Sequence, residues 1–411
     1  MPDEPDIQTP RRVAPSAIDR ELRKMWSEAS ADPAHPVIRA RILNLVIFVD
    51  AQGLAEAGNA AAELAAGHPS RTIIVGMNPG AAESRLEAEV SARCNISFGR
   101  RPQICSEQIV ITADGRSVDD VHGLVSPLLT SDLRTFLWWR MAGWPHGHSF
   151  DVLAQHCDRI LVDSGRFVSA ATELKVLFTL IRELGHRKPA PLPIGDLNWT
   201  RLGVWRAALA SLYDVPQYQD RLGRLSGITI SYIPTTAHHE SSGREFKSGP
   251  RAAMPMEPLL MAGWLASRLG WTGPSASVPA ENRPDCVFTF ANMSGVELVL
   301  SPVQPEAGAA GAAPVNTAEI KLQEQPSAGV RTITRVQFKC AGDSTTEFSI
   351  RFQDSCLHTS VVIDGLPQAG RVVACDDKPD GELVAEELDI LGNDSVYEDA
   401  IRTASVLADL L

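Results

Sequence analysis

Long apolar runs are missing from this sequence of 411 residues. Even residues 42–49 (ILNLVIFV) are interrupted by Asn44 and followed by Asp50, whereas a helix that crosses a bilayer needs about 20 consecutive apolar residues. The first twelve residues are acidic and proline-rich and then basic, without the apolar stretch of a secretory signal. We therefore expect a cytoplasmic protein without membrane association.

The glycine-rich loops that hold nucleotides are also missing. Residues 43–49 predict a first buried strand, but AQGLAE follows at 51–56 where a dinucleotide-binding fold has GxGxxG. No lysine-containing phosphate loop follows any other predicted strand. We therefore expect no cofactor.

Cysteines are few and scattered. The seven are Cys94, Cys105, Cys157, Cys286, Cys340, Cys356 and Cys375, with no CxxC pair and no Cys and His at zinc-ligand spacing. This excludes the common structural zinc sites, and we expect no metal. Free thiols packed as small hydrophobic side chains are the prediction, and a thiol-based redox sensor is the alternative.

Positive charge is in deficit. There are 38 Lys and Arg residues against 50 Asp and Glu, a formal net charge of -12. The field of such a chain repels a phosphate backbone, so nucleic acid is excluded as a partner. The acidic residues near the C-terminus, from Glu382 to Asp399, are interpreted as a solvated helix face, with contact to a basic partner as the alternative.

The composition that remains, 44% hydrophobic and 21% charged, is that of an ordinary globular protein. At this length two domains are expected. Strand patterns alternate with helix patterns in the first part, which predicts an α/β domain over residues 1–272 with a mostly parallel sheet flanked by helices. The predicted strands are 43–49, 107–112, 132–139, 159–163 and 227–233, and the predicted helices include 18–30, 54–66, 170–183, 202–212 and 258–269.

A change of composition marks the second part. Residues 273–284 carry three prolines and no hydrophobic pattern, which predicts a linker. Short alternating strands and two C-terminal helical stretches then predict a smaller α+β domain over residues 285–411.

Four stretches of sequence occur in a distinctive order: residues 41–46 (RILNLV), 68–72 (HPSRT), 132–139 (DLRTFLWW) and 196–202 (DLNWTRL). Together they resemble the OpcA family of glucose-6-phosphate dehydrogenase assembly proteins. The resemblance is strongest over residues 39–271. It implies a non-catalytic assembly factor and allosteric activator of glucose-6-phosphate dehydrogenase, in the oxidative pentose phosphate pathway of carbohydrate metabolism.

Tryptophan and arginine in these stretches are candidates for contact with a partner, because these residue types dominate protein–protein hot spots. Trp138 and Trp139 are adjacent, so in a strand their side chains point to opposite faces. The nominated interface residues are Trp139, Trp199, Arg201 and Arg206, against the plain alternative that the tryptophans fill the core.

Two places carry residue types that bind anions. His68 stands just before the predicted strand that begins at Arg71, and Arg71 lies within it. The stretch 235–247 (TTAHHESSGREFK) follows the predicted strand 227–233. In that second stretch His238, His239 and Glu240 supply bases, while Arg244 and Lys247 supply a phosphate clamp. The alternative function is therefore an enzyme that acts on sugar phosphates, lactonase- or isomerase-like. The plainer interpretation is that these histidines are solvated or lie in an interface. No residue is assigned as catalytic in the favoured interpretation.

Overall fold

The computed structural model describes residues 7–31, 37–94, 103–167, 169–187, 190–234, 254–277, 285–303, 331–342, 345–390 and 392–411. The chain forms two compact units, and neither is continuous in sequence. Unit 1 comprises Met1–Asp163, Ile181–Thr200 and Lys378–Asn393, and unit 2 comprises Ser164–Leu180, Arg201–Asp377 and Asp394–Leu411.

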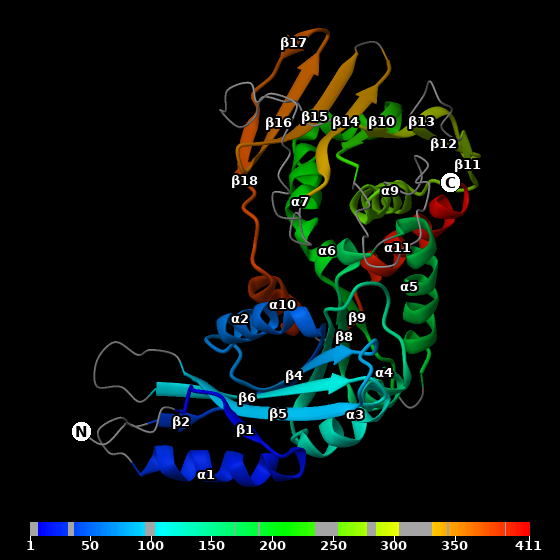
Figure 1. Cartoon of the computed structure of the whole chain (residues 1–411). Coiled ribbons are helices and arrows are strands. Elements are labelled where there is room, and N and C mark those ends of the chain that lie inside the picture. Colours follow the sequence, from blue (N-terminus) through cyan, green and yellow to red (C-terminus); the bar gives the residue numbers. More distant parts are fainter. Residues whose placement is uncertain are drawn as a thin grey trace, which may run out of the picture. The chain divides into compact units, whose positions relative to one another are not determined.

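Unit 1 is built on a nine-stranded sheet, sheet A, whose strand order is β1-β5-β6-β4-β3-β7-β8-β9, with β2 beside β6 (Figure 1). The strands from β6 to β9 in this order are parallel, and β5 is antiparallel to both β6 and β1. The bounds are β1 (Arg11–Val13), β2 (Val37–Arg39), β3 (Leu43–Asp50), β4 (Ser70–Asn78), β5 (Arg85–Cys94), β6 (Gln103–Asp114), β7 (Arg134–Trp139), β8 (Arg159–Val162) and β9 (Ile194–Asp196).

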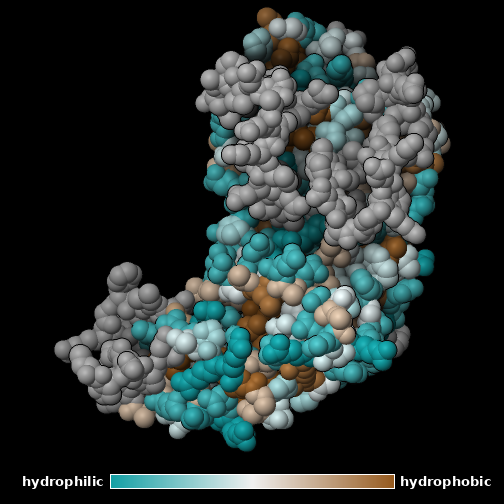
Figure 2. Space-filling view, in the orientation of Figure 1, coloured by the Kyte–Doolittle hydropathy of each residue, from teal (hydrophilic) through white to brown (hydrophobic). Residues whose placement is uncertain are grey.

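Helices cover both faces of sheet A. Helix α1 (Ile18–Ser30) lies on one face, and α2 (Leu54–Leu64) and α10 (Asp380–Leu388) lie on the other (Figure 1). Residues 43–49 are buried throughout, as expected for a parallel strand covered on both sides. The outward surface of α1 is largely hydrophilic (Figure 2), consistent with its apolar spacing on the inner side. The other helices with residues in unit 1 are α3 (Ser117–Val125), α4 (His148–Leu153), α5 (Ala170–Gly185) and α6 (Leu197–Arg201), the last two shared with unit 2.

Unit 2 is built on a second nine-stranded sheet, sheet B, of order β11-β12-β13-β10-β14-β15-β16-β17, with β18 beside β16. Among the described strands of sheet B, only the β10–β13 pair is parallel. The bounds are β10 (Leu225–Tyr232), β11 (Pro274–Ser277), β12 (Cys286–Phe290), β13 (Met293–Pro302), β14 (Ile333–Cys340), β15 (Thr346–Gln353), β16 (Cys356–Ile363), β17 (Leu366–Pro367) and β18 (Arg371–Ala374).

The helices of unit 2 pack on one face of sheet B, so its strands alternate buried and exposed residues. They are α7 (Gly203–Leu212), α8 (Pro216–Gln219), α9 (Met256–Arg268) and α11 (Ser395–Asp409). Helices α9 and α11 approach closely at Gly263, where an added Cβ would lie 2.3 Å from the carbonyl oxygen of Ala400. Asp394 caps α11 by accepting hydrogen bonds from the N–H groups of Val396 and Tyr397.

The predicted fold class is confirmed: a mostly parallel α/β sheet flanked by helices, and a second, largely antiparallel sheet with helices. The division between the units lies elsewhere than the predicted linker at 273–284, of which 278–284 fall outside the described residues. Residues 227–233 were expected in the first sheet, but β10 pairs with β13 and β14 in sheet B. Helices α7 and α9 accompany it, so the second unit is not the smaller one.

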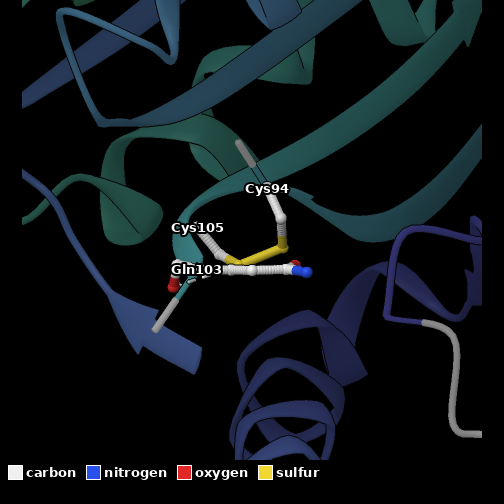
Figure 3. Close-up of a disulfide and its surroundings, with 3 residues drawn as sticks. All are labelled: Cys94, Gln103 and Cys105. Carbon is white, nitrogen blue, oxygen red and sulfur yellow. Dashed lines mark hydrogen bonds between the residues drawn. A yellow bond between two sulfur atoms is a disulfide. The ribbon is translucent and has the colours of Figure 1, made fainter. Parts of the chain in front are cut away.

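A disulfide corrects the expectation of seven free thiols. Strand β5 was not predicted, and it pairs with β6 so that Cys94 lies directly opposite Cys105. The two sulfur atoms are bonded in this structure (Figure 3). The other five cysteines are free, and only Cys356 among them is more than slightly exposed.

Within the described residues, helices long and apolar enough to cross a bilayer are absent. The same residues contain no group of three or more His, Cys, Asp or Glu side chains arranged to hold a metal ion.

The disulfide gives a direct prediction. Alkylation of the denatured, unreduced protein should modify five of the seven cysteines, and alkylation after reduction should modify all seven, as counted by mass spectrometry. Peptide mapping should place the protected pair at Cys94 and Cys105. Seven reactive thiols without reduction would contradict the bond.

Candidate functional site

The carboxyl edge of sheet A is where α/β folds usually bind ligands. Here the guanidinium of Arg140, 6% exposed, occupies the space beside the turn that follows β3. Its Nη2 donates to Glu56 Oε2 at 2.6 Å and its Nε donates to Asp380 Oδ2 at 3.1 Å. Because two carboxylates accompany one guanidinium, the start of α2 offers a phosphate no net positive charge.

Further along helix α10, a buried ion pair holds it against sheet A at the start of β8. Arg159 Nη2 donates to Glu387 Oε2 at 2.6 Å, and the two side chains are 3% and 4% exposed. Thr200 Oγ1 donates to the other carboxylate oxygen at 2.7 Å, and Arg159 Nη1 donates to the carbonyl oxygen of Gly392 at 2.8 Å. Both carboxylate oxygens and both terminal guanidinium nitrogens therefore have hydrogen-bond partners, which lowers the cost of burying the pair.

Apolar contacts complete the docking of α10. Leu383, Val384 and Leu388 belong to the same buried cluster as the alanine-rich face of α2 and Leu64. His68 Nε2 lies 3.2 Å from Asp389 Oδ1, one residue beyond the end of α10. The predicted anion-binding histidine thus contacts a carboxylate of its own chain.

A second charged cluster surrounds Glu107 of β6. Its side chain is 0% exposed, and four donors reach its two oxygens. Arg71 Nε donates to Oε2 at 2.7 Å, Arg41 Nη1 to Oε2 at 3.3 Å, and the indole N–H of Trp26 to Oε1 at 2.8 Å. Arg39 also pairs with Oε1, and its guanidinium lies 5.5 Å from the centre of the Trp26 ring. We call Arg39, Arg41, Arg71 and Glu107 the Glu107 cluster.

The Glu107 cluster is not electrically balanced. Three guanidiniums face one carboxylate, which leaves two positive charges. Burial alone raises the pKa of Glu107, but the arginines outweigh it, led by Arg71, and hold that pKa below its usual value. Burial and the charges of Arg41 and Arg71 lower the pKa of Arg39, against the opposing effect of Glu107.

The two predicted members of the first anion site each contact a carboxylate of the chain, Asp389 for His68 and Glu107 for Arg71. Arg71 is buried, and besides Glu107 it donates to the carbonyl oxygen of Leu128 at 2.6 Å. Its N–H groups thus serve the interior of unit 1. The other nominated residues, His238, His239, Arg244 and Lys247, with Glu240, lie outside the described residues.

The nominated tryptophans are buried. Trp139 is 2% exposed and packs on Phe48 and Phe150, while Trp138 belongs to the cluster on the α2 face. The two rings therefore point to opposite faces, as predicted, and both faces are covered. Trp199 is 3% exposed. Contact of Trp139 or Trp199 with a partner stays a prediction, and in this structure both side chains are interior.

The nominated arginines are half-buried. The guanidinium of Arg201 interacts electrostatically with the carboxylate of Glu257. That carboxylate accepts hydrogen bonds from the N–H and hydroxyl of Thr332 at 2.6 and 2.8 Å. Burial raises the pKa of Glu257, and the charge of Arg201 opposes that rise. Arg206 lies on α7. Their role in an interface also stays a prediction.

Sequence reasoning missed Glu107, Arg140, Arg159 and Glu387 as organising residues. One signal was available for Glu107, a carboxylate two residues before the apolar run 109–111. For Arg159 and Glu387 the sequence offers no comparable signal, because the partners are separated by 228 residues.

Two family models match the chain. One, described as the glucose-6-phosphate dehydrogenase subunit N-terminal domain, matches residues 61–178, and one described as that subunit's C-terminal domain matches residues 192–401. The chain belongs to the OpcA family. This confirms the resemblance found in its motifs.

Relatives named OpcA match about half of this chain. An OxPP cycle protein OpcA of Nostoc punctiforme is 31% identical over 210 residues, which is 51% of this chain and 40% of the relative. One of Synechocystis is 29% identical over 224 residues, 54% of this chain and 42% of the relative. The match thus spans less than half the length of these relatives.

Solved structures are similar only distantly. A 3-ketoreductase, KijD10 of Actinomadura kijaniata, is 10% identical with a TM-score of 0.44, over 89% of this chain and 96% of its own. Biliverdin reductase of Synechocystis is 14% identical with a TM-score of 0.44, over 90% and 98%. Likeness of this degree carries no argument about activity or cofactor.

The Arg159–Glu387 pair predicts a large stability effect. Glu387→Ala leaves a buried guanidinium without its counter-charge, so unit 1 should lose about 3–5 kcal/mol of its free energy of unfolding. Hydrogen exchange of the sheet A amides measures this separately from unit 2. Glu386→Ala is the matched control, because it removes only the exposed pair with Lys378 and should cost less than about 1 kcal/mol. Equal effects of the two substitutions would disprove the assigned role.

Glu107 predicts a dependence of stability on pH. Its folded pKa is lowered, so its contribution is fully present above the unfolded value of about 4.3 and is lost as pH falls through the folded pKa. Glu107→Gln should therefore destabilise unit 1 by about 3 kcal/mol at pH 7. The difference from the unsubstituted protein should shrink as the pH is lowered below about 4.

The measurement is hydrogen exchange of β4 and β6 amides over a pH series. Glu89→Gln is the control, because Glu89 pairs with Arg12 at the surface. A constant difference between Glu107→Gln and the unsubstituted protein at all pH values would contradict the argument.

Proposed function

We propose that this protein is a non-catalytic assembly partner and allosteric activator of glucose-6-phosphate dehydrogenase. The observation that carries the proposal is the match of both family models, each described as part of a glucose-6-phosphate dehydrogenase subunit. The names of the relatives, OxPP cycle protein OpcA, support the same pathway. The protein acts in this proposal by binding the dehydrogenase rather than by chemistry of its own.

The geometry of unit 1 supports a binding protein. At the carboxyl edge of sheet A, the ligand position of many α/β enzymes, Arg140 is paired with Glu56 and Asp380. Arg71, predicted with His68 as an anion-binding candidate, donates to Glu107 and to the carbonyl oxygen of Leu128. Cationic side chains at these two places thus stabilise the fold. The sugar-phosphate enzyme rested on residues 238–247, and no described contact favours it.

Activation in this proposal is a matter of linkage. A partner that binds the active assembly of the dehydrogenase more tightly than the inactive form shifts the population by its difference in affinity and no more. A difference of about 1.4 kcal/mol shifts the ratio of the two forms tenfold. The ion-paired, closely packed interior of unit 1 suits a rigid partner surface, which keeps the ordering cost of binding low.

The test is to mix the purified protein with the dehydrogenase of the same organism. Light scattering should show a species heavier than either component, and initial rates against glucose 6-phosphate concentration should show a lower KM or a higher kcat. The protein alone should show no turnover of glucose 6-phosphate with NADP. An unrelated acidic protein at equal concentration controls for crowding. Absence of both a complex and a rate change would refute the proposal.

A further inference from the structure

Exposed isoleucines gather at the amino edge of sheet A. Ile38 in β2 is 49% exposed and Ile104 in β6 is 44% exposed, and these two residues are register partners in the parallel β2–β6 pair. Side chains in this relation lie side by side on one face of a sheet. Ile42, 56% exposed, lies just before β3 and donates its N–H to the carbonyl oxygen of Pro69. Clustered exposed apolar side chains mark interaction surfaces.

Strand β2 is also an edge. It pairs with β6 on one side, and among the described residues no strand pairs with its other side. Only three residues long, β2 leaves main-chain groups on that side able to pair with an extended segment. An edge strand of this kind presents its two rows of side chains to whatever pairs with it.

The side chains on the opposite face of β2, the second row, carry the charge. Arg39 follows Ile38 and therefore points to the opposite face, toward Trp26 of α1. Arg39 and Arg41 each touch Glu107, but their side chains are 32% and 26% exposed, whereas Arg71 is 9% exposed. The two unbalanced positive charges of the Glu107 cluster therefore lie nearest the surface at Arg39 and Arg41.

This surface is fixed in place. Glu107 is fully buried and holds both arginines, and the Trp26 ring lies under Arg39. Cys105, the register partner of Arg39 in β6, is bonded to Cys94 of β5. A preorganised guanidinium loses little freedom when it binds a carboxylate, which favours affinity.

We propose that the edge of β2 is the docking surface for the dehydrogenase and receives an extended acidic segment of that enzyme. Carboxylates of the segment pair with Arg39 and Arg41 on one face, and its aliphatic side chains cover Ile38 and Ile104 on the other. The choice of an acidic occupant follows from the two positive charges that no carboxylate among the described residues of the Glu107 cluster balances, in a chain of net charge -12. This inference rests on the proposed function.

Charge-assisted pairs of arginine with carboxylate are strong and geometrically specific. Within an interface that excludes water, the same pairs gain strength because solvent screening is lost. The isoleucines supply the apolar contact area that surrounds such pairs in protein interfaces. Each of the two rows therefore has its own contribution, and each can be removed separately.

The experiment measures the dissociation constant of the complex with the dehydrogenase for two variants. Ile38→Ser/Ile104→Ser removes the apolar row, and Arg39→Gln/Arg41→Gln removes the charged row. Each should weaken binding about tenfold or more, equivalent to about 1.4 kcal/mol. The arginine variant should also lose most of the salt dependence of binding. Ile390→Ser, at a residue 38% exposed, and Arg402→Gln, at an exposed ion pair, are the matched controls and should bind within about twofold of the unsubstituted protein.

The outcomes separate the two proposals. If the unsubstituted protein forms no complex, the proposed function fails and this docking surface fails with it. If the unsubstituted protein binds and both double variants bind as tightly as it does, the docking surface is wrong and the proposed function stands. Hydrogen exchange of the sheet A amides shows whether a variant has lost its fold. If Arg39→Gln/Arg41→Gln has, Arg41→Gln alone is tested in its place, and its affinity for the dehydrogenase should fall by the same factor.

A small anion is the competing ligand for Arg39 and Arg41. If millimolar inorganic phosphate protects the β2 and β6 amides, if Arg39→Gln/Arg41→Gln abolishes that protection, and if the dehydrogenase affinity is unchanged, the cluster is a phosphate site and the docking surface is overturned.

Discussion

The ion pair between Arg159 and Glu387 is the contact on which the integrity of unit 1 depends. Arg159 opens strand β8 in the middle of the sequence, and Glu387 belongs to a helix formed near its end. Neither charge tolerates burial without the other, since an unpaired buried ion is destabilising by several kcal/mol. The pair therefore fixes where α10 lies, and α10 in turn covers the alanine-rich face of α2.

Two charged clusters in unit 1 illustrate different uses of the same residue types. Around α10 each guanidinium meets at least one carboxylate, and the side chains of Arg140 and Arg159 are almost fully buried. Around Glu107 three guanidiniums share one carboxylate, and two of them reach solvent. Balanced charge in the interior serves the fold. Unbalanced charge at a surface is available to a partner, which favours the β2 edge as the docking surface.

Much of sheet A could be predicted because its strands carry local signals. Residues 43–49 form a continuous apolar run, as a strand covered on both faces should, and the adjacent Trp138 and Trp139 had to point to opposite faces. Strand β10 has the same kind of signal, but a pattern of apolar residues does not state which sheet it joins. Its pairing with β13 and β14 depends on partners up to 115 residues away, for example Cys340 opposite Leu225.

The sites were less predictable, because they are formed by partners distant in sequence. The acidic residues from Glu382 to Asp399 were predicted to form a solvated helix face, yet Glu387 is buried against Arg159. Arg71 was predicted as a candidate for binding an anion, and the carboxylate it contacts is that of Glu107, 36 residues later. The pairing of Cys94 with Cys105 was missed because strand β5 was not predicted.

The return of the chain from sheet B to α10 determines the order in which the protein can be completed during synthesis. Unit 1 needs Lys378–Asn393, and nearly all of unit 2 is translated before those residues leave the ribosome. Until then Ala57, Ala60, Ala61 and Leu64 of α2 lack their cover from Leu383, Val384 and Leu388. A nascent chain with this apolar face uncovered is prone to association with other chains and to capture by chaperones. The N-terminal half is thus not an independent folding module, although its sheet is encoded almost entirely in the first 200 residues.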